Sequence, residues 1–272
     1  KSGIFLKVMT GKIPKALTIA GSDSGGGAGI QADLKTFSAL GVHGSSVVTA
    51  ITAQNTKEVT AVHNVPLDII EKQMDAVLSD IGADAVKIGM LSNSDIIKTV
   101  AKKLKDYKLK NIVLDPVMVA ASRARLLEDS AIVSLKKELI PLALVVTPNI
   151  PEAEVLVNKK IKDINDAKNA AKEIIKLGCK NVLIKGGHLN ISNDGVIDIL
   201  YDGKTFIEIK NKKINKIGHG TGCTLSSAIA ANIAKGMELK EAVKSAINYV
   251  HNALEKGFKA GKMNYVLRHN LK

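Results

Sequence analysis

The stretch that decides the fold is Ala16-Leu17-Thr18-Ile19-Ala20, which runs directly into Gly21-Ser22-Asp23-Ser24-Gly25-Gly26-Gly27-Ala28-Gly29. The short apolar run predicts a buried strand, and the glycine-rich segment after it predicts a tight loop. Apolar spacing over Ala28–Leu40 then predicts a helix. This strand–loop–helix order recurs along the chain, which predicts an α/β fold with a mainly parallel central sheet and helices on both faces.

The same patterns place the other elements. We expect further strands at Ser45–Gln54, Glu58–Val65, Ala85–Met90, Asn111–Met118, Leu142–Thr147, Val182–Lys185, Ile197–Tyr201 and Thr205–Ile209. We expect further helices at Ile69–Leu78, Ile96–Leu104, Ser130–Leu139, Pro151–Leu156, Ala167–Leu177, Gly222–Lys235 and Leu239–Lys256. The sequence shows no linker, internal repeat or low-complexity segment, so residues 15–272 are interpreted as one domain after an N-terminal extension of residues 1–14. Met9 is a candidate native start, with Lys1–Val8 as an upstream remnant.

Composition narrows the class of protein. With 46% hydrophobic and 24% charged residues, the 272-residue chain resembles a soluble globular protein. Its two cysteines, Cys179 and Cys223, are too few for a disulfide framework or a four-cysteine zinc site, which predicts a reducing, cytoplasmic location. No apolar run is long enough to span a membrane, and the first residues lack the pattern of a signal peptide.

The net charge of +13 needs its own interpretation. The lysines are spread along predicted helices, as expected of solvated faces, and aromatic residues make up only 3% of the chain. Nucleic-acid binding by base stacking is therefore not expected. We expect a small-molecule partner, with no nucleic acid and no membrane.

Small and polar residues follow nearly every predicted strand. These clusters are Gly21-Ser22-Asp23, Gln54-Asn55, Gly89-Met90, Asp115-Pro116, Thr147-Pro148-Asn149 and Lys185-Gly186-Gly187-His188. Open parallel sheets bind ligands at the carboxyl ends of their strands. The clusters therefore predict an active-site edge.

His219-Gly220-Thr221-Gly222-Cys223 precedes an Ala-rich predicted helix. A helix N-terminus presents unpaired N–H groups and the positive end of the dipole, which together favour an anion. The dipole is expected to lower the pKa of the Cys223 thiol. This segment predicts chemistry on a phosphate; the alternative is a glycine-rich turn that only caps a core helix, with His219 in a structural position.

The other clusters each leave alternatives open. Gly21–Gly29 lacks the spacing of the common nucleotide-binding loops and is either a tight connection or a substrate lip. Asp33 is either an exposed acid of the first helical turn or a hydrogen-bond acceptor for a ligand. Asn149 and Glu152 either cap a helix or hold waters of a hydrated Mg²⁺. Lys185, beside two glycines, is suited to neutralising phosphate charge.

The chain resembles hydroxymethylpyrimidine/phosphomethylpyrimidine kinases of thiamine biosynthesis, in the ribokinase-like superfamily that also contains pyridoxal kinases. The resemblance rests on eight motifs. They are Ala16–Asp23, Gly26–Phe37, Thr52-Ala53-Gln54-Asn55-Thr56, Lys87-Ile88-Gly89-Met90-Leu91, Leu114-Asp115-Pro116-Val117-Met118, Thr147-Pro148-Asn149-Ile150-Pro151-Glu152-Ala153, Lys185-Gly186-Gly187-His188 and His219–Ser226. They occur in family order. The resemblance implies a ribokinase-like three-layer sandwich.

The resemblance also implies roles for individual residues. Gly220, Thr221 and Gly222 match the anion hole for the transferred phosphoryl group, and Cys223 takes the place of the aspartate base of sugar-kinase relatives, either as a base or as an orienting thiol. Lys185 and Asn149 match the ATP side, and Glu152 and Asn149 the metal side, through water. The positions that match the pyrimidine site are Gln54, Asp33, Gly21, Met90 and Val117.

The implied activity is the ATP- and Mg²⁺-dependent phosphorylation of 4-amino-5-hydroxymethyl-2-methylpyrimidine (HMP) to its monophosphate and onward to the diphosphate, by a homodimer. A pyridoxal or pyridoxine kinase is the alternative within the superfamily. Where the family continues Gly-Asp-x-Leu-Leu, this chain has Arg123-Ala124-Arg125-Leu126-Leu127. That departure keeps open a non-catalytic pyrimidine-binding protein. The tail, Gly261–Asn270, only weakly resembles the family's glycine-rich, His-containing ending.

Overall fold

The computed structural model describes residues 12–118, 128–188 and 195–271. Most of the predicted N-terminal extension (residues 1–11) and the Arg123-Ala124-Arg125 loop lie outside the described residues.

Nine strands of the described chain form one central sheet with the order β3-β2-β1-β4-β5-β6-β7-β8-β9. The neighbours from β2 to β7 pair in parallel, whereas β3, β8 and β9 are joined by antiparallel pairings. Their bounds are β1 Lys15–Asp23, β2 His43–Gln54, β3 Val59–Asn64, β4 Ala85–Ile88, β5 Ile112–Leu114, β6 Val145–Val146, β7 Val182–Ile184, β8 Gly195–Tyr201 and β9 Phe206–Lys212. The mainly parallel sheet predicted from the sequence is confirmed.

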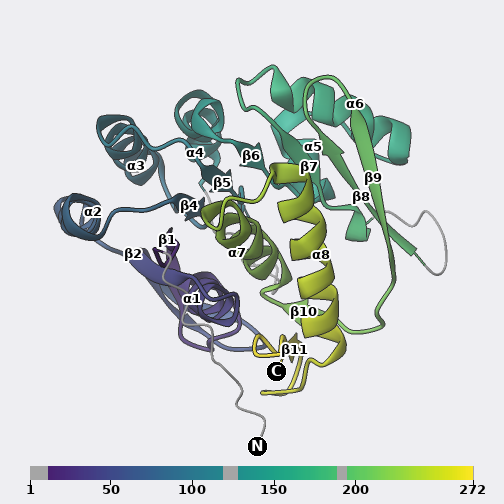
Figure 1. Cartoon of the computed structure of the whole chain (residues 1–272), viewed down its shortest axis with the longest axis horizontal. Coiled ribbons are helices and arrows are strands. Elements are labelled where there is room, and N and C mark those ends of the chain that lie inside the picture. Colours follow the sequence, from purple (N-terminus) through teal and green to yellow (C-terminus); the bar gives the residue numbers. More distant parts are fainter. Residues whose placement is uncertain (1–11, 119–127, 189–194, 272) are drawn as a thin grey trace, which may run out of the picture.

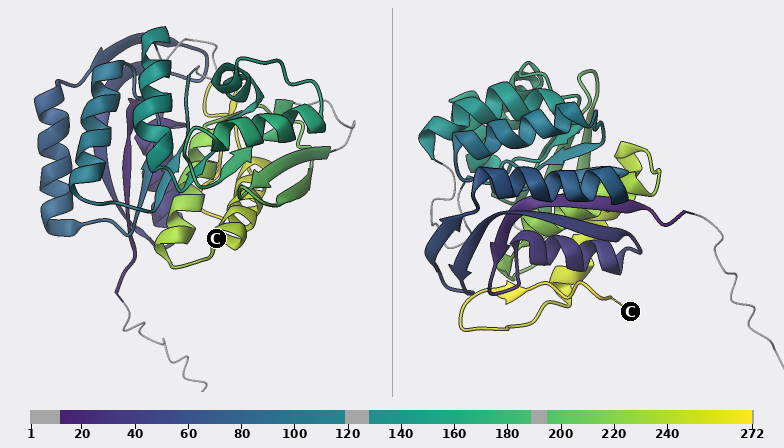
Figure 2. Two further views of the ribbon diagram at one scale, coloured as in Figure 1. Left: turned by 90° about the horizontal axis from the view of Figure 1, so that it is seen from above. Right: turned by 90° about the vertical axis from the view of Figure 1, so that its left-hand side faces the viewer.

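Helices cover both faces of this sheet (Figures 1 and 2). One layer contains α1 Gly29–Ala39, α7 Thr221–Ala234 and α8 Leu239–Glu255. The other contains α2 Leu67–Ala76, α3 Ser94–Asp106, α4 Asp129–Ser134, α5 Ile150–Val157 and α6 Ile164–Ile175. The buried side chains form one hydrophobic cluster on each face of the sheet, so the predicted three-layer architecture is confirmed.

The position of α7 follows from its sequence. Small residues run along it, and Ala228, Ala230 and Ala231 are fully buried, as are Ser226 and Ser227. Small side chains on several sides let a helix pack closely on more than one neighbour, and α7 contacts α1, α8 and the strands β1, β4 and β5. The helix therefore lies against the middle of the sheet, with its N-terminus at the carboxyl ends of those parallel strands.

Differences from the predicted elements lie mainly at their ends. The strand predicted at Asn111–Met118 is regular only over Ile112–Leu114, and the one predicted at Leu142–Thr147 only over Val145–Val146. Leu142 belongs to a 3₁₀ turn that contains Pro141, a residue that donates no backbone hydrogen bond. A further two-stranded parallel pair joins β10 Gly218–His219 and β11 Tyr265–Val266. It was not predicted, because strands of two residues are too short to show a periodic pattern.

Candidate active site

Asp23 organises the glycine-rich loop after β1. Its Oδ1 accepts the N–H of Gly25, and its Oδ2 accepts the N–H groups of Gly27 and Ala28. The same Oδ2 lies 2.8 Å from Nε2 of His219. Burial raises the pKa of Asp23, but these hydrogen bonds outweigh it and hold the pKa below its usual value. The sequence marked Asp23 only as part of a strand-end cluster; the structure makes it the residue that joins two loops of the site.

His219 lies between Asp23 and Gln54. The Nε2 atom of the Gln54 amide is 3.3 Å from Nε2 of the imidazole. His219 itself is buried, and a Cβ atom at Gly27 would collide with its ring. This histidine therefore connects the loop before α7 with the carboxyl ends of β1 and β2.

Gly220 forms the turn that begins α7. Its φ of 85° is in the left-handed region, and a Cβ atom there would collide with the carbonyl oxygen of Gly27. No side chain in the described structure caps α7, and its first turn carries no acidic residue. The N–H groups of Thr221 and Gly222 are thus left for an anion, as the sequence predicts for a phosphate site.

Cys223 is a half-buried thiol in the first turn of α7. Burial raises its pKa to about 11, and the charges of Asp33 and Asp115 act in the same direction. Lys87 and the backbone N–H of Gly29 oppose this shift without reversing it. The predicted lowering of this pKa is wrong, because loss of hydration, together with the two carboxylates, outweighs the two opposing contributions. At neutral pH Cys223 is a thiol, which favours its role as an orienting group.

Lys185 lies at the end of β7 among carboxylates. Its Nζ is 2.8 Å from Oδ1 of Asp115 and 3.8 Å from Oε2 of Glu152. Burial lowers the pKa of Lys185, but the two carboxylates outweigh burial and raise it. A Cβ atom at Gly222 would lie 3.4 Å from this Nζ, so the lysine reaches the N-terminus of α7. Asp115 lies in one of the motifs quoted from the sequence, but no role was predicted for it. Its position directly after the strand β5 could have indicated a place at the active-site edge.

Asn149 and Glu152 form a capping box at the start of α5. The Asn149 side chain accepts the N–H of Glu152 at 2.9 Å, and Glu152 accepts the N–H of Asn149 at 2.8 Å. The capping role predicted for this pair is therefore confirmed, and its role toward Mg²⁺ stays a prediction. Burial also raises the pKa of Glu152 to about 7, although Lys185 opposes the shift. A carboxyl group with this pKa changes charge near neutrality.

The donor set around Lys185 fits a hydrated divalent cation. The described residues contain no group of three or more His, Cys, Asp or Glu side chains close enough to hold a metal ion alone. Mg²⁺ usually keeps several waters and takes one or two carboxylates together with substrate phosphates. Asp115 and Glu152 supply two such carboxylates beside the anion-binding turn.

The predicted pyrimidine-binding residues are only partly brought together. A Cβ atom at Gly21 would lie 3.1 Å from Sδ of Met90, so these two positions are in contact. Gln54 lies beside His219, as described above, at the end of the neighbouring strand β2. Val117 is half-buried and follows Asp115 by two residues, and no contact joins it to the other predicted pyrimidine-binding residues in the described structure.

Asp33 is fully buried, so the expectation of an exposed first-turn acid is wrong. Its Oδ2 accepts hydrogen bonds from Oγ1 of Thr18 at 2.6 Å and from Nζ of Lys87 at 2.8 Å. Its Oδ1 accepts one from Oγ of Ser227 at 2.6 Å. Asp33 thereby ties β1 and β4 to α7 one turn after Cys223. Lys87 was not predicted to be functional. A lysine inside the otherwise apolar strand Ala85–Ile88 could have indicated a buried charge with a partner.

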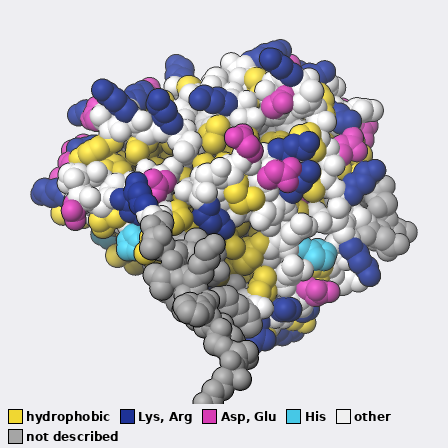
Figure 3. Space-filling model, viewed as in Figure 1, with side chains coloured by type: hydrophobic (Ala, Val, Ile, Leu, Met, Phe, Trp, Pro, Cys, Tyr) yellow, Lys and Arg dark blue, Asp and Glu magenta, His cyan; other side chains and the backbone are white. Residues whose placement is uncertain are grey.

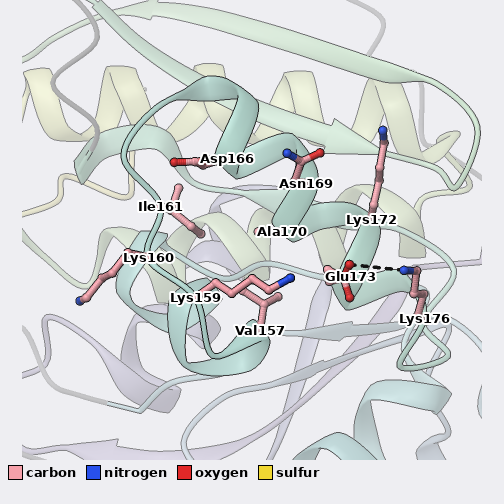
Figure 4. A pocket seen from close by; sticks show the side chains of 10 residues that line it. All are labelled: Val157, Lys159, Lys160, Ile161, Asp166, Asn169, Ala170, Lys172, Glu173 and Lys176. Atoms are coloured by element: carbon pink, nitrogen blue, oxygen red, sulfur yellow. Dashed lines mark hydrogen bonds and ion pairs between the residues drawn. The ribbon is translucent and has the colours of Figure 1, made fainter.

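The surface offers a hollow away from this edge, between α5 and α6 (Figure 4). It has a volume of ≈ 350 Å³ and is lined by lysines, including Lys159, Lys160 and Lys172. Glu173 in its wall pairs with Lys176 at 3.3 Å. Figure 3 likewise shows basic side chains interspersed with acidic ones on the face drawn there. These charges are solvated, whereas the carboxylates Asp23, Asp115 and Glu152 at the ends of the strands are buried.

No helix in the described ranges combines the length and the apolar character needed to cross a membrane.

Three comparisons with known proteins show what this chain is similar to. The family model for phosphomethylpyrimidine kinase matches residues 23–268. Hydroxymethylpyrimidine/phosphomethylpyrimidine kinase of Bacillus subtilis is 48% identical over 244 residues, covering 89% of this chain and 90% of that protein. The crystal structure of phosphomethylpyrimidine kinase from Clostridium difficile matches with a TM-score of 0.80 and 50% identity, covering 89% of this chain and 99% of that one. Pyridoxal kinase from Staphylococcus aureus, in complex with AMP-PCP, matches with a TM-score of 0.88 and 39% identity, covering 96% and 94%.

Proposed function

The chain belongs to the phosphomethylpyrimidine kinase family, and from this premise we propose that it phosphorylates HMP with ATP and then phosphorylates the monophosphate to the diphosphate. The observation that carries the proposal is the uncapped N-terminus of α7, with Lys185 next to Gly222 and the Gln54–His219 pair directly before Gly220. An anion-binding turn beside a cationic group is suited to stabilising the charge that develops during phosphoryl transfer.

On the phosphate side, Lys185 would contact the ATP phosphates together with Asn149. Asp115 and Glu152 would hold Mg²⁺, with Asn149 acting through water. When bound, Mg²⁺ supplies positive charge that neutralises the phosphate oxygens. Lys185, which pairs with Asp115 and Glu152 in this structure, would then be free to turn toward the transferred phosphoryl group.

On the substrate side, Gln54 would hydrogen-bond the ring nitrogen and exocyclic amine, while Gly21, Met90 and Val117 would line the ring. Asp33 would act indirectly, since its carboxylate is buried against Lys87. The hydroxyl group would be oriented by the Cys223 thiol for in-line attack. The N–H groups at Gly220–Gly222 would stabilise the charge that develops on the phosphoryl oxygens.

Forming a Cys223 thiolate at neutral pH would be costly. A pKa of about 11 corresponds to roughly 5 kcal/mol of deprotonation free energy at pH 7. We therefore propose that the thiol orients the attacking hydroxyl, rather than accepting its proton in a prior step. The loose transition state of phosphoryl transfer needs little help from a base.

The test is ADP release with HMP, its monophosphate and pyridoxal as separate substrates. We expect turnover with both pyrimidines, and at least a hundredfold loss in Cys223→Ala with nearly unchanged nucleotide binding. Cys179→Ala is the matched control, because Cys179 is buried away from the site. Full turnover in Cys223→Ala would remove this residue from the mechanism.

Pyridoxal kinase is the second candidate, favoured by the TM-score of 0.88 to the Staphylococcus aureus structure. Competition between HMP and pyridoxal for the same enzyme separates the two, and a preference for pyridoxal would overturn the first proposal. A non-catalytic pyrimidine-binding protein would bind HMP and release no ADP.

The remaining expectations belong to the same proposal. We place this kinase in the cytoplasm, as a homodimer in which residues 15–272 form one domain, and we assign it no nucleic-acid or membrane partner. The family resemblance supports the dimer, and light scattering on the purified chain tests it.

A further inference from the structure

The last segment of the chain packs against the anion-binding turn, although no element was predicted there. In the parallel pair β10–β11, Gly218 is opposite Tyr265 and His219 is opposite Val266. The N–H of Tyr265 also donates to the carbonyl of Ile217 at 3.0 Å. Figure 1 shows this pair below α8, close to the C-terminus. The chain end thus runs beside the loop that leads into Gly220.

The segment closes on itself through one pair of backbone hydrogen bonds and is anchored on α8 at two points. Phe258 and Val266 exchange backbone hydrogen bonds of 3.1 Å and 2.9 Å. The N–H of Arg268 donates to the carbonyl of Ala253 at 3.0 Å, and the Tyr249 hydroxyl donates to the carbonyl of His269 at 2.8 Å. These bonds fix residues 258–270, here named the C-terminal strap, on a rigid helix.

His269 is the point at which the strap reaches α7. Its Nε2 is hydrogen-bonded to Oγ1 of Thr224 at 3.1 Å. Thr224 is 0% exposed and His269 only 8% exposed, so neither group can exchange this partner for water without opening the structure. Burial, with a contribution from Lys35, lowers the pKa of His269 to about 4, so the ring is neutral at pH 7. Thr224 directly follows Cys223 in the first turn of α7.

The strap touches the site at two further places. A Cβ atom at Gly218 would lie 3.3 Å from Cδ1 of the buried Leu267, so the strap packs on the loop before Gly220. At its other end, a Cβ atom at Gly261 would collide with Oγ1 of Thr56. Thr56 follows Gln54 by two residues in the turn between β2 and β3. The strap therefore contacts both the phosphate loop and the substrate-side hairpin.

We propose that the C-terminal strap is a positioning element of the active site, and that His269, through Thr224, is a positioning residue for Cys223 and the anion-binding turn. The physical reason is that α7 begins without a side-chain cap and with a glycine in the left-handed region, so its first turn lacks the usual local restraints. The strap supplies restraints from outside the helix. The catalytic part of this inference rests on the proposed function; the structural coupling does not.

Cysteine alkylation tests the coupling without turnover. Iodoacetamide labelling is followed by peptide mass spectrometry in wild type, His269→Leu, His269→Gln and Arg268→Ala. We expect Cys223 to react at least fivefold faster in His269→Leu, because its turn loosens, while Cys179 keeps its wild-type rate. His269→Gln, whose amide can replace Nε2 as donor or acceptor, and the exposed control Arg268→Ala should match wild type. Equal acceleration of both cysteines, or no change in Cys223, would overturn the proposal.

Steady-state ADP release tests the consequence for catalysis. Losing a buried hydrogen bond that aligns the transition state predicts a kcat about ten- to a hundredfold lower in His269→Leu, with the KM for ATP changed less than threefold. His269→Gln should restore most of kcat. Unchanged kcat in His269→Leu, or failure of Gln to rescue it, would contradict the positioning role. If wild type releases no ADP with either pyrimidine, the proposed function fails, whereas the alkylation result still decides the coupling.

Discussion

Replacing Lys87 by methionine should destabilise the protein by about 3 kcal/mol, because it leaves the Asp33 carboxylate buried without its counter-charge. Both side chains are 0% exposed, and Nζ of Lys87 lies 2.8 Å from Oδ2 of Asp33. Methionine keeps the length and the apolar stem of the lysine, so the main change is the loss of charge.

The magnitude follows from the partners that remain. Breaking a buried ion pair from one side costs about 3–5 kcal/mol. The hydroxyl groups of Thr18 and Ser227 still donate to Asp33, which places the expected loss at the lower end of that range. In a chain of this size, 3 kcal/mol corresponds to a fall of roughly 6 °C or more in Tm. The double variant Lys87→Met/Asp33→Asn removes both charges and should recover about 2 kcal/mol of the loss.

Urea unfolding followed by far-ultraviolet circular dichroism measures these differences, since the chain has no tryptophan. The matched control is Lys72→Met, which breaks an exposed pair with Asp68 of 3.0 Å and should change stability by less than about 0.5 kcal/mol. A loss below 1 kcal/mol in Lys87→Met, or a double variant no more stable than the single one, would refute the reasoning.

Three further predictions concern the site and its strap. Gly220→Ala should lower kcat at least a hundredfold, because its Cβ would collide with the carbonyl of Gly27. The control Gly236→Ala, which is also at positive φ but has open space around it, should stay active. The KM for Mg·ATP should fall as pH rises from 6 to 8, because burial raises the pKa of Glu152 to about 7 and only the ionised carboxylate attracts the cation. A Glu152→Gln variant with the same pH profile as wild type would contradict this. Stability should decrease by up to roughly 3 kcal/mol as pH falls from 6.5 to 4, since burial lowers the pKa of His269 to about 4 and the unfolded state takes up the proton first. Thermal melts at pH 7 and 4.5 check the last prediction, and His269→Gln should lose less stability than wild type over that range.

Much of the fold could be predicted because its strands are continuous apolar runs. Val182–Ile184 is fully buried on both faces of the sheet, so every residue in it is apolar and the strand can be predicted from the sequence. Strand ends were harder to predict, as at Asn111–Met118, because the residues after a parallel strand enter loops whose path depends on the neighbouring helices. The strand-end rule marked Lys185, and the glycine turn before an Ala-rich helix marked Gly220, because both patterns are local in the sequence.

What the sequence determined by itself was the order of strands and helices, the carboxyl edge at which the polar clusters gather, and the glycine turn that begins α7. Only the tertiary structure decided the raised pKa of Cys223, the burial of Asp33 against Lys87, and the contact between His269 and Thr224. The physical reason is that backbone conformation responds to near neighbours in the chain, whereas hydration and charge pairing depend on which distant segments pack together. Thr224 and His269 are 45 residues apart in sequence, and no local pattern in either segment predicts their hydrogen bond.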